Sequence, residues 1–298
     1  MLLTGSLDYR TTPALKLRGG ALKPVSDDLV VEGVLQIRIA GEPYSVTMRT
    51  PGDDENLALG LLFAEGVISG MDAVASCEAG ALRSALGSAL GPEAALGGGP
   101  SGIDADGSAD GCVDLTLRAD GATAAPHGRR RLASNASCGA CGKVSAGDLA
   151  AVQSLGGCGM SAVPVTAMLP WLETQMQEAQ SLFRRTGGSH AAAMFDADGG
   201  LLVLKEDVGR HNAVDKAVGQ LLRDGRLEEA RMLLISGRVS YEIVSKAAKA
   251  GIRVLLAVSA PSSLAVKLCD EAGIALLGFC RGGDATIYTH AGKLGMAA

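Results

Sequence analysis

Apolar and polar residues alternate along two short stretches near the start of the chain, over 35–39 and 44–48, on either side of Gly41-Glu42-Pro43. A period of two is typical of a β-strand with one buried face, and glycine and proline between two such stretches favour a turn. The pattern therefore predicts a β-hairpin. Residues 1–28, which precede it, show no period and are predicted to form a polar, irregular arm.

A helix is predicted directly after this hairpin. The segment Thr50-Pro51-Gly52-Asp53-Asp54-Glu55 combines a proline, which the first helical turn tolerates, with carboxylates, which the positive end of the helix dipole favours. Gly66 is the expected end of the helix. Further strands are predicted over 73–78 and 113–117. The stretch 87–111 between them holds eight glycines and two prolines and is expected to be a disordered insertion.

The pattern changes after Pro164. Apolar residues recur at helical spacing as far as Phe183 and predict one long helix that ends near Gly187-Gly188. Two apolar runs, 190–195 and 201–204, then predict a second hairpin. Beyond it, predicted helices over 213–222, 241–250 and 262–272 alternate with predicted strands over 232–235, 254–258, 274–279 and 285–288. This alternation predicts an α/β fold with a largely parallel sheet that helices cover on both faces.

These patterns divide the chain into four parts. We expect an N-terminal arm over 1–28, a β-rich N-terminal domain over 29–133, a mobile loop with two cysteines over 134–147, and an α/β domain over 148–298. The length of 298 residues and the hydrophobic content of 47% are sufficient for substantial cores.

Composition narrows the classes of function. A net charge of −5, a pI near 5.4 and an aromatic content of 3% argue against a nucleic-acid partner. Seven cysteines, an odd number spread over a long chain, do not resemble a secreted disulfide framework, so a cytoplasmic location is expected. Residues 1–20 lack the features of a signal peptide, and no apolar run is long enough to span a membrane, so no membrane association is expected.

Two cysteines three residues apart carry the most distinctive chemistry. Cys138 and Cys141 lie in Ser134–Lys143, where glycines and small residues predict a loop. A zinc site would need a second pair at suitable spacing, but Ser161 stands three residues after Cys158, so no metal is expected. A thioredoxin-like motif lies between a strand and a helix and usually has an apolar residue before its first cysteine, whereas this loop has a serine there.

A mobile, nucleophilic cysteine of the sulfur-carrier kind is therefore the favoured interpretation. The thiolate is the reactive form, and a free cysteine with a pKa of about 8.5 is only slightly ionised near neutral pH. Lys143 and the run Arg129-Arg130-Arg131 are cations close enough in sequence to stabilise the anion. Three consecutive arginines are equally typical of a solvated surface turn.

A second set of candidate residues is expected at one edge of the predicted sheet, because ligands of such sheets bind beyond the carboxyl ends of the strands. The segments there are Glu206–Asn212, Ser236–Ser240, Ser259–Ser263 and Phe279–Asp284. Three of the four place arginine beside glycine, a combination that suits phosphate binding at a helix start. None of them is a Walker A sequence or a G-x-G-x-x-G fingerprint.

Each of these segments also has a structural explanation when it is taken alone. Asn212 and Ser240 are suited to cap helices, Pro261 to start one, and Arg238 to carry a surface charge. His211 is either a base or phosphate donor, or a hydrogen-bonding structural residue at a helix start.

Six segments in this order resemble the formate dehydrogenase accessory sulfurtransferase family (FdhD type). They are Thr50-Pro51-Gly52-Asp53, Ser137-Cys138-Gly139-Ala140-Cys141-Gly142, Asp207–Lys216, Ser236-Gly237-Arg238, Ser259-Ala260-Pro261-Ser262 and Gly278-Phe279-Cys280-Arg281-Gly282. The match covers roughly residues 28–290 apart from the glycine-rich insertion. The resemblance implies a cytidine-deaminase-like α/β fold with a mixed or parallel sheet, a smaller N-terminal α+β domain, and a homodimer.

The resemblance also implies a function in the maturation of formate dehydrogenase. Members of the family accept sulfane sulfur from a cysteine desulfurase as a persulfide and pass it to molybdenum bis(molybdopterin guanine dinucleotide), which then enters the apoenzyme. Cys138 would hold the persulfide, and Cys141 would assist transfer or close a disulfide that releases sulfide. The implied cofactor residues are Phe279, Cys280, Arg281, Gly282, Gly283 and Asp284, with GDP as a partial analogue of the cofactor. Phosphate chemistry adds Arg210, His211, Asn212, Arg238 and Ser259 as candidates.

Two other classes of function stay open. One is a chaperone that binds the cofactor and uses the two cysteines as a redox switch, without sulfur transfer. The other, a zinc-dependent deaminase, would need a His-x-Glu or Cys-x-Glu pair followed by Pro-Cys-x-x-Cys, and the cysteine loop lacks that proline.

Overall fold

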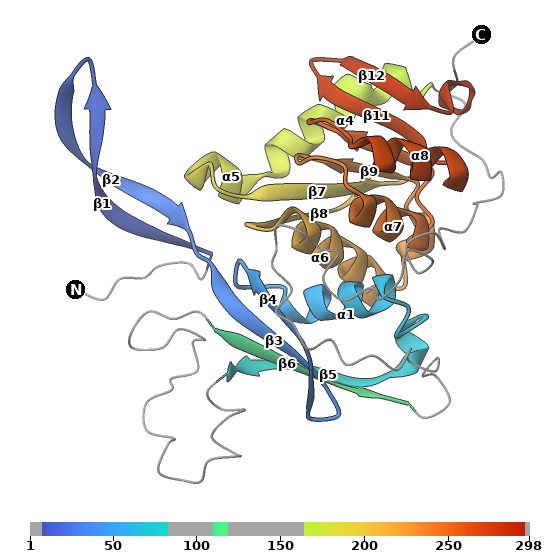
Figure 1. Cartoon of the computed structure of the whole chain (residues 1–298), viewed down its shortest axis with the longest axis horizontal. Coiled ribbons are helices and arrows are strands. Elements are labelled where there is room, and N and C mark those ends of the chain that lie inside the picture. The colour runs from blue at the N-terminus through green and yellow to red at the C-terminus, as the bar shows by residue number, and fades with distance from the viewer. Residues whose placement is uncertain (1–7, 83–109, 119–163, 296–298) are drawn as a thin grey trace.

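The computed structural model of the protein describes residues 8–82, 110–118 and 164–295, which form two sheets, the helices around them and a projecting ribbon (Figure 1). The expected disordered insertion, apart from its last two residues, lies outside the described residues. So does the cysteine loop with Cys138 and Cys141, together with Arg129–Arg131 and Cys158.

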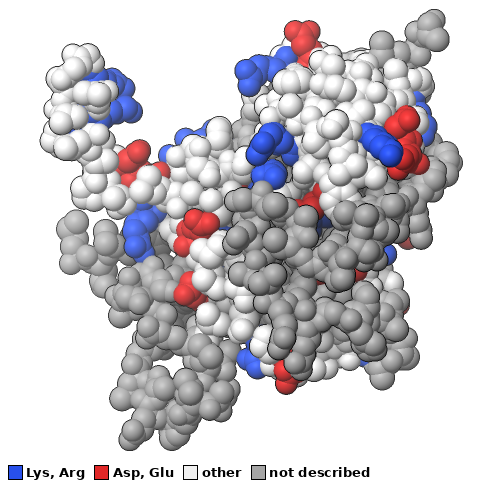
Figure 2. Space-filling model, in the orientation of Figure 1, with Lys and Arg blue, Asp and Glu red and all other residues white. Residues whose placement is uncertain are grey.

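The ribbon replaces the irregular arm predicted for residues 1–28. Strands β1 (Tyr9–Arg18) and β2 (Ala21–Val30) pair antiparallel along their full length and project from the body (Figure 1). The prediction is wrong from Tyr9 onward because neither face of the ribbon's outer part is buried, so no strand pattern was recognised there. Figure 2 shows basic side chains at the ribbon's outer end, where Leu15, Leu17 and Leu22 are also exposed.

The N-terminal sheet confirms the first predicted hairpin and the two strands after it. Its order is β4-β3-β6-β5, formed by β3 (Gly33–Ile39), β4 (Glu42–Arg49), β5 (Val74–Ala81) and β6 (Gly111–Leu117). Helix α1 (Asp54–Ala64) begins three residues after Pro51, and Gly66 follows its end with a left-handed backbone, as predicted. A short 3₁₀ helix, η1 (Met71–Ala73), leads into β5.

The C-terminal sheet is mixed rather than largely parallel. Its order is β12-β11-β10-β9-β7-β8, formed by β7 (His190–Phe195), β8 (Leu201–Asp207), β9 (Met232–Ile235), β10 (Val254–Ala257), β11 (Ala275–Arg281) and β12 (Asp284–Thr289). Only β9, β10 and β11 run parallel to one another. The pairs β7–β8 and β11–β12 are antiparallel because their connections are too short for a crossover.

Helices cover both faces of this sheet, as predicted. Helices α6 (Arg210–Arg223), α7 (Tyr241–Lys249) and α8 (Ser263–Ala272) pack on one face, and α4 (Val165–Ala179) packs on the other. Two short 3₁₀ helices, η3 (Leu227–Glu229) and η4 (Ala291–Leu294), complete this half. No helix among the described residues is both long and apolar enough to cross a membrane.

The single long helix predicted after Pro164 is two helices. Helix α4 ends before Gln180, and α5 (Ser181–Thr186) follows and ends at Gly187. The Glu206 carboxylate accepts hydrogen bonds from the backbone N–H groups of Leu182 and Phe183, both at 2.8 Å. A residue distant in sequence therefore caps α5 and allows the break, which helical periodicity does not reveal.

One continuous hydrophobic core connects the two halves through the crossing of α1 and α6. The helices meet at Gly60 and Gly219, and a Cβ atom on Gly219 would lie 1.9 Å from the carbonyl oxygen of Asn56. Glycine is required at both positions because the two backbones touch. In Figure 1, α1 lies between the N-terminal sheet and α6. The layers therefore follow one another as the N-terminal sheet, α1, the helices α6, α7 and α8, the C-terminal sheet, and α4.

Candidate functional site

Backbone hydrogen bonds join the segments that follow β9 and β10 and the last residues of β11 into one edge of the C-terminal sheet. Val239 N–H donates to the Ala260 carbonyl at 3.2 Å, and Ser262 N–H donates to the Val239 carbonyl at 2.9 Å. Phe279 N–H donates to the Ser259 carbonyl at 3.3 Å. The predicted gathering of these segments at the carboxyl ends of the parallel strands is thus observed, and their backbones hold one another in place.

A histidine that is not among the predicted site residues lies at this edge. Strand β7 runs antiparallel to β9, so its first residue, His190, lies beside the end of β9. His190 Nδ1 is 3.3 Å from Ser236 Oγ, which also accepts a hydrogen bond from Ala191 N–H at 3.0 Å. The sequence signal was a histidine directly after Gly187-Gly188-Ser189, but its location depends on strand order, which the sequence does not show.

Two of the predicted arginines lie close to this histidine. A Cβ atom on Gly237 would be 3.2 Å from Arg210 Cδ and 3.4 Å from His190 Nδ1, so both side chains lie directly against this glycine and Arg210 would have to shift slightly to admit a larger residue. Burial lowers the pKa of His190, and the positive charges of Arg210 and Arg238 lower it further, against an opposing contribution from Asp207. His190 is therefore mainly neutral near pH 7, beside two permanent cations.

Phe279 has an unusual backbone at the end of β11. Its φ is 55°, a left-handed value that is uncommon for a bulky residue, and its side chain is 51% exposed. Left-handed backbone costs roughly 1–2 kcal/mol in a non-glycine residue. An exposed aromatic ring held in a strained backbone at a sheet edge is typical of a binding surface rather than of a core.

The remaining residues of this predicted cofactor segment form a hairpin turn. Gly282 and Gly283 connect β11 to β12, with Arg281 paired to Asp284, which confirms the two strands predicted over 274–279 and 285–288 on either side of this turn. A Cβ atom on Gly283 would lie 3.1 Å from Pro170 Cγ of α4, so the turn packs against that helix.

Cys280 and Glu173 lie beneath this turn. The Cys280 side chain is buried, and burial raises the pKa of its thiol to about 11. Glu173 of α4 is also buried, and its Oε2 accepts a hydrogen bond from Gly283 N–H at 3.3 Å. A buried carboxylate therefore supports the turn from below, and the only sequence signal for it is an acidic residue among the apolar residues of the predicted helix.

Two predicted phosphate-binding residues are buried and make contacts within the fold. His211 Nε2 lies 3.2 Å from Ser240 Oγ and 3.1 Å from Glu242 Oε2. Asn212 Nδ2 donates to the Met48 carbonyl at 2.7 Å and to Asp207 Oδ1 at 3.0 Å. These contacts favour the structural alternative for both residues, whereas Arg238 is exposed and Ser259 is partly exposed at the edge.

Two segments that carried the family resemblance meet in one buried polar network. Asp207 Oδ2 accepts a hydrogen bond from Thr50 N–H at 3.0 Å and pairs with Lys216 Nζ at 2.8 Å. Lys216 also donates to the Thr50 carbonyl at 2.8 Å, and Val208 N–H donates to Thr50 Oγ1 at 3.0 Å. The network fixes the end of β4 against α6, so these residues hold the two halves of the molecule together.

Among residues 8–82, 110–118 and 164–295, no three His, Cys, Asp or Glu side chains are grouped so that they could hold a metal ion. The described edge instead offers arginine, neutral histidine, serine, backbone N–H groups and an exposed aromatic ring. This set of groups is suited to an anion with an aromatic part, such as a nucleotide.

Comparisons with known proteins agree with the resemblance in the sequence. The model of the FdhD/NarQ family matches residues 30–295. A protein of Mycolicibacterium paratuberculosis named sulfur carrier protein FdhD is 43% identical over 273 residues, which cover 90% of this chain and 92% of that protein. A protein of the same name from Streptomyces avermitilis is 40% identical, with 95% of each chain covered.

A solved structure shares the fold. The crystal structure of a protein from Desulfotalea psychrophila, described as a formate dehydrogenase accessory protein, superposes with a TM-score of 0.69. The superposition covers 96% of this chain and 99% of the other at 18% identity. The family match over most of the chain and the relatives at 40% identity or more together show that this protein belongs to the FdhD/NarQ family.

Proposed function

We propose that this protein is a sulfur carrier for formate dehydrogenase, and that the carboxyl edge of β9, β10 and β11 binds the cofactor that receives the sulfur. The observation that supports the binding site most directly is the placement of Arg210 and Arg238 beside the neutral His190 on a backbone that is already fixed. The relatives named sulfur carrier protein FdhD support the sulfur chemistry.

The proposed cargo is molybdenum bis(molybdopterin guanine dinucleotide), a substrate that carries diphosphate groups and guanine bases. Arg238 is exposed at the edge and is suited to pair with a phosphate through its planar donors. Phe279 offers an exposed ring on which a planar base can stack. The Phe279–Asp284 turn, supported by Glu173, would hold that ring in place without a large loss of conformational entropy on binding.

Cys138 is proposed to carry the sulfur. Its thiolate attacks the outer sulfur of a persulfide on a cysteine desulfurase, which forms the Cys138 persulfide and releases the desulfurase thiolate. The outer sulfur is then passed to molybdenum before the cofactor enters the formate dehydrogenase apoenzyme. Its bond to Cys138 Sγ breaks, Cys138 is released as the thiolate, and the metal of the cargo supplies the two electrons that bring the sulfur to the sulfide level. Attack of the Cys141 thiolate on the Cys138 sulfur would instead expel hydrosulfide and leave a disulfide, which a cellular thiol must reduce. A cytoplasmic homodimer is proposed as the working form.

Sulfur loading tests the carrier function. The purified protein is incubated with a cysteine desulfurase and sulfur-labelled cysteine, and intact mass and peptide mapping then locate the added sulfur. We expect one added sulfur atom on Cys138, none in Cys138→Ala, and unchanged loading in Cys77→Ala, which removes a half-buried thiol elsewhere. Full loading and full formate dehydrogenase maturation in Cys138→Ala would refute the role of Cys138.

GDP binding tests the proposed cofactor edge independently of sulfur. We expect Arg238→Gln to weaken GDP binding about tenfold in calorimetry, because one charge-assisted contact contributes roughly 1.5 kcal/mol. Lys267→Gln removes an equal charge from an exposed position of α8 and serves as the control. Equal GDP affinities of the wild type and Arg238→Gln would remove that arginine from the site.

A further inference from the structure

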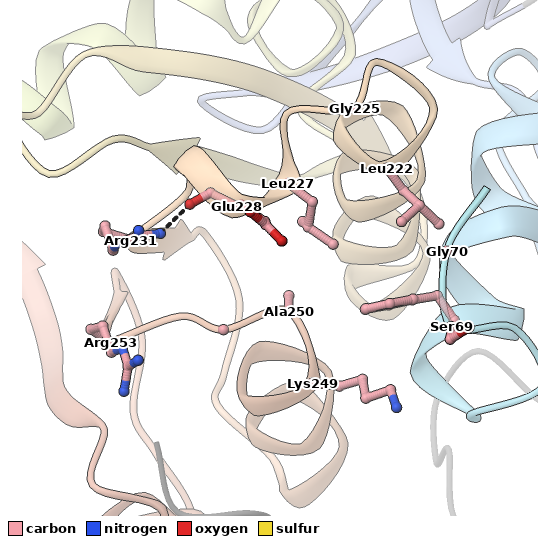
Figure 3. Close-up of a pocket in the computed structure, with 12 residues that line it drawn as sticks. Ser69, Gly70, Leu222, Gly225, Leu227, Glu228, Arg231, Lys249, Ala250 and Arg253 are labelled. Atoms are coloured by element: carbon pink, nitrogen blue, oxygen red, sulfur yellow. Dashed lines mark hydrogen bonds between the residues drawn. The ribbon is translucent and has the colours of Figure 1, made fainter. Parts of the chain in front are cut away.

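A cavity lies at the opposite edge of the C-terminal sheet from the proposed cofactor site, at the amino ends of the parallel strands. It has a volume of about 540 Å³ and is bounded by the ends of α1, α6 and α7 and by the residues that precede β9 and β10 (Figure 3). This size falls within the range of pockets that bind small molecules. Neither the proposed sulfur transfer nor the proposed cofactor edge uses this cavity.

The cavity combines apolar walls with a basic rim. Apolar side chains at the ends of the helices form the walls, namely Phe63, Leu222, Leu227 and Ala250. Arg231 and Arg253 directly precede β9 and β10, and Lys249 belongs to the last turn of α7. Ser69 and Gly70 close the side formed by the N-terminal half (Figure 3).

The three cations are available to a ligand. Within the described residues, no ion pair joins Arg231, Lys249 or Arg253 to a carboxylate, and Glu228 is the only acidic residue that lines the cavity. Three positive charges and one negative charge leave an excess of positive charge here, in a protein whose net charge is −5. Such a local reversal of sign attracts anions.

Two of the three cations are also held in position. Arg231 donates through Nη1 to the Ala230 carbonyl at 2.9 Å and to the Glu228 carbonyl, so its guanidinium is fixed at the rim (Figure 3). Lys249 Nζ lies 5.6 Å from the centre of the Phe63 ring, within the range of a cation–π contact. A preorganised rim of this kind lowers the entropic cost of binding.

We propose that this cavity is a binding site for a small organic anion with an aromatic or aliphatic body. The apolar walls would bury the body of the ligand, and the positive charges of Arg231, Lys249 and Arg253 around the rim would attract its negative group. A carboxylate and a phosphate share this chemistry, and a competition experiment can distinguish them. The site would be occupied independently of GDP, because the proposed cofactor edge lies at the other ends of the same strands.

Binding of 8-anilinonaphthalene-1-sulfonate, an aromatic anion, tests the site by fluorescence titration of the folded protein. We expect one saturable site, with affinity about fivefold weaker in Lys249→Gln and in Arg253→Gln and about 25-fold weaker in the double variant, because each partly exposed ion pair contributes about 1 kcal/mol. Lys267→Gln, with the same charge change on exposed α8, should bind the dye as the wild type does.

Competitors then identify the negative group. Phenyl phosphate and 3-phenylpropionate are compared as displacers of the dye, with neutral 3-phenylpropanol as the uncharged control. Displacement by either anion, and not by the alcohol or by GDP, would support the proposal. The anion that displaces the dye at the lower concentration indicates whether the natural ligand is a phosphate or a carboxylate. The proposal is overturned if no saturable binding occurs, if both cation variants bind the dye normally, or if the alcohol competes as well as the anions.

Discussion

The crossing of α1 and α6 gives the most quantitative prediction about stability. In Gly219→Ala, the new Cβ would lie 1.9 Å from the Asn56 carbonyl oxygen and 2.9 Å from Gly60 N, whereas Cβ contacts below 3.0 Å essentially never occur. Because both contacts are to backbone atoms, no side-chain rotation can relieve them. The helices must separate by about 1 Å, and with them the two sheets that they connect.

The expected cost follows from two opposing contributions. Overpacking of a well-packed contact costs typically 1–3 kcal/mol, and backbone contacts belong at the upper end of that range or above it. Alanine recovers about 1 kcal/mol of helix propensity relative to glycine. We therefore expect Gly219→Ala to lower the free energy of unfolding by about 2 kcal/mol. Gly60→Ala should behave alike, since its Cβ would lie 2.0 Å from the Asp215 carbonyl oxygen.

Urea unfolding followed by circular dichroism measures both variants. Gly292→Ala is the matched control, because a Cβ atom there meets no atom within 4 Å. The double variant Gly60→Ala/Gly219→Ala should lower the free energy of unfolding by less than the sum of the two single variants, since both substitutions push the same two helices apart. A Gly219→Ala protein as stable as Gly292→Ala, or strict additivity of the two substitutions, would refute the close helix crossing.

Three further predictions concern titratable groups. Burial raises the pKa of Asp215 to about 6 although Lys246 lies 2.6 Å away, so the folded protein binds this proton more tightly than the unfolded chain. Stability should therefore fall by up to about 3 kcal/mol as pH rises from 4 to 6, and urea titrations should show that Asp215→Asn removes this slope. Burial raises the pKa of Cys280 to about 11, so this thiol should be alkylated slowly at pH 8 in the native protein and rapidly in urea. Peptide mapping measures both rates, and rapid alkylation of the native protein would contradict the burial of Cys280. Burial and two arginines lower the pKa of His190, and a bound phosphate would oppose that shift. GDP should therefore bind more tightly as pH falls from 8 to 6, and its affinity should depend less on pH in His190→Gln. Identical pH profiles of the two proteins would place the nucleotide elsewhere.

Much of the fold was predictable because its elements have local signatures. Alternating residues identified β3 and β4, and helical periodicity identified α6, α7 and α8, each within a few residues of the observed bounds. Three features were not predictable for physical reasons. The ribbon of β1 and β2 lacks a buried face along most of its length, the break at Gln180 depends on the distant Glu206, and the order of strands depends on tertiary packing.

The candidate site was predictable only in part. The segments after β9, β10 and β11 were expected at one edge because parallel strands end together, and backbone hydrogen bonds now connect them. His190 was not recognised because an antiparallel strand brings its first residue to that edge. Glu173 was not recognised because its partner, Gly283, is distant in sequence. The roles of Cys138 and Cys141 stay predictions, since both lie outside the described residues.

The burial of each candidate residue determines what its substitution can reveal. His211 and Asn212 contact the fold through Ser240 and the Met48 carbonyl, so replacing either would change stability and binding together. Arg238 is exposed on a loop that backbone hydrogen bonds already hold, so its loss can change ligand binding without moving the loop. If Arg238→Gln binds the ligand more weakly at unchanged stability, the loss therefore reports on the site itself. The same loss of affinity in Asn212→Ala could result either from a lost ligand contact or from a displacement of β4, and the measurement would not distinguish the two.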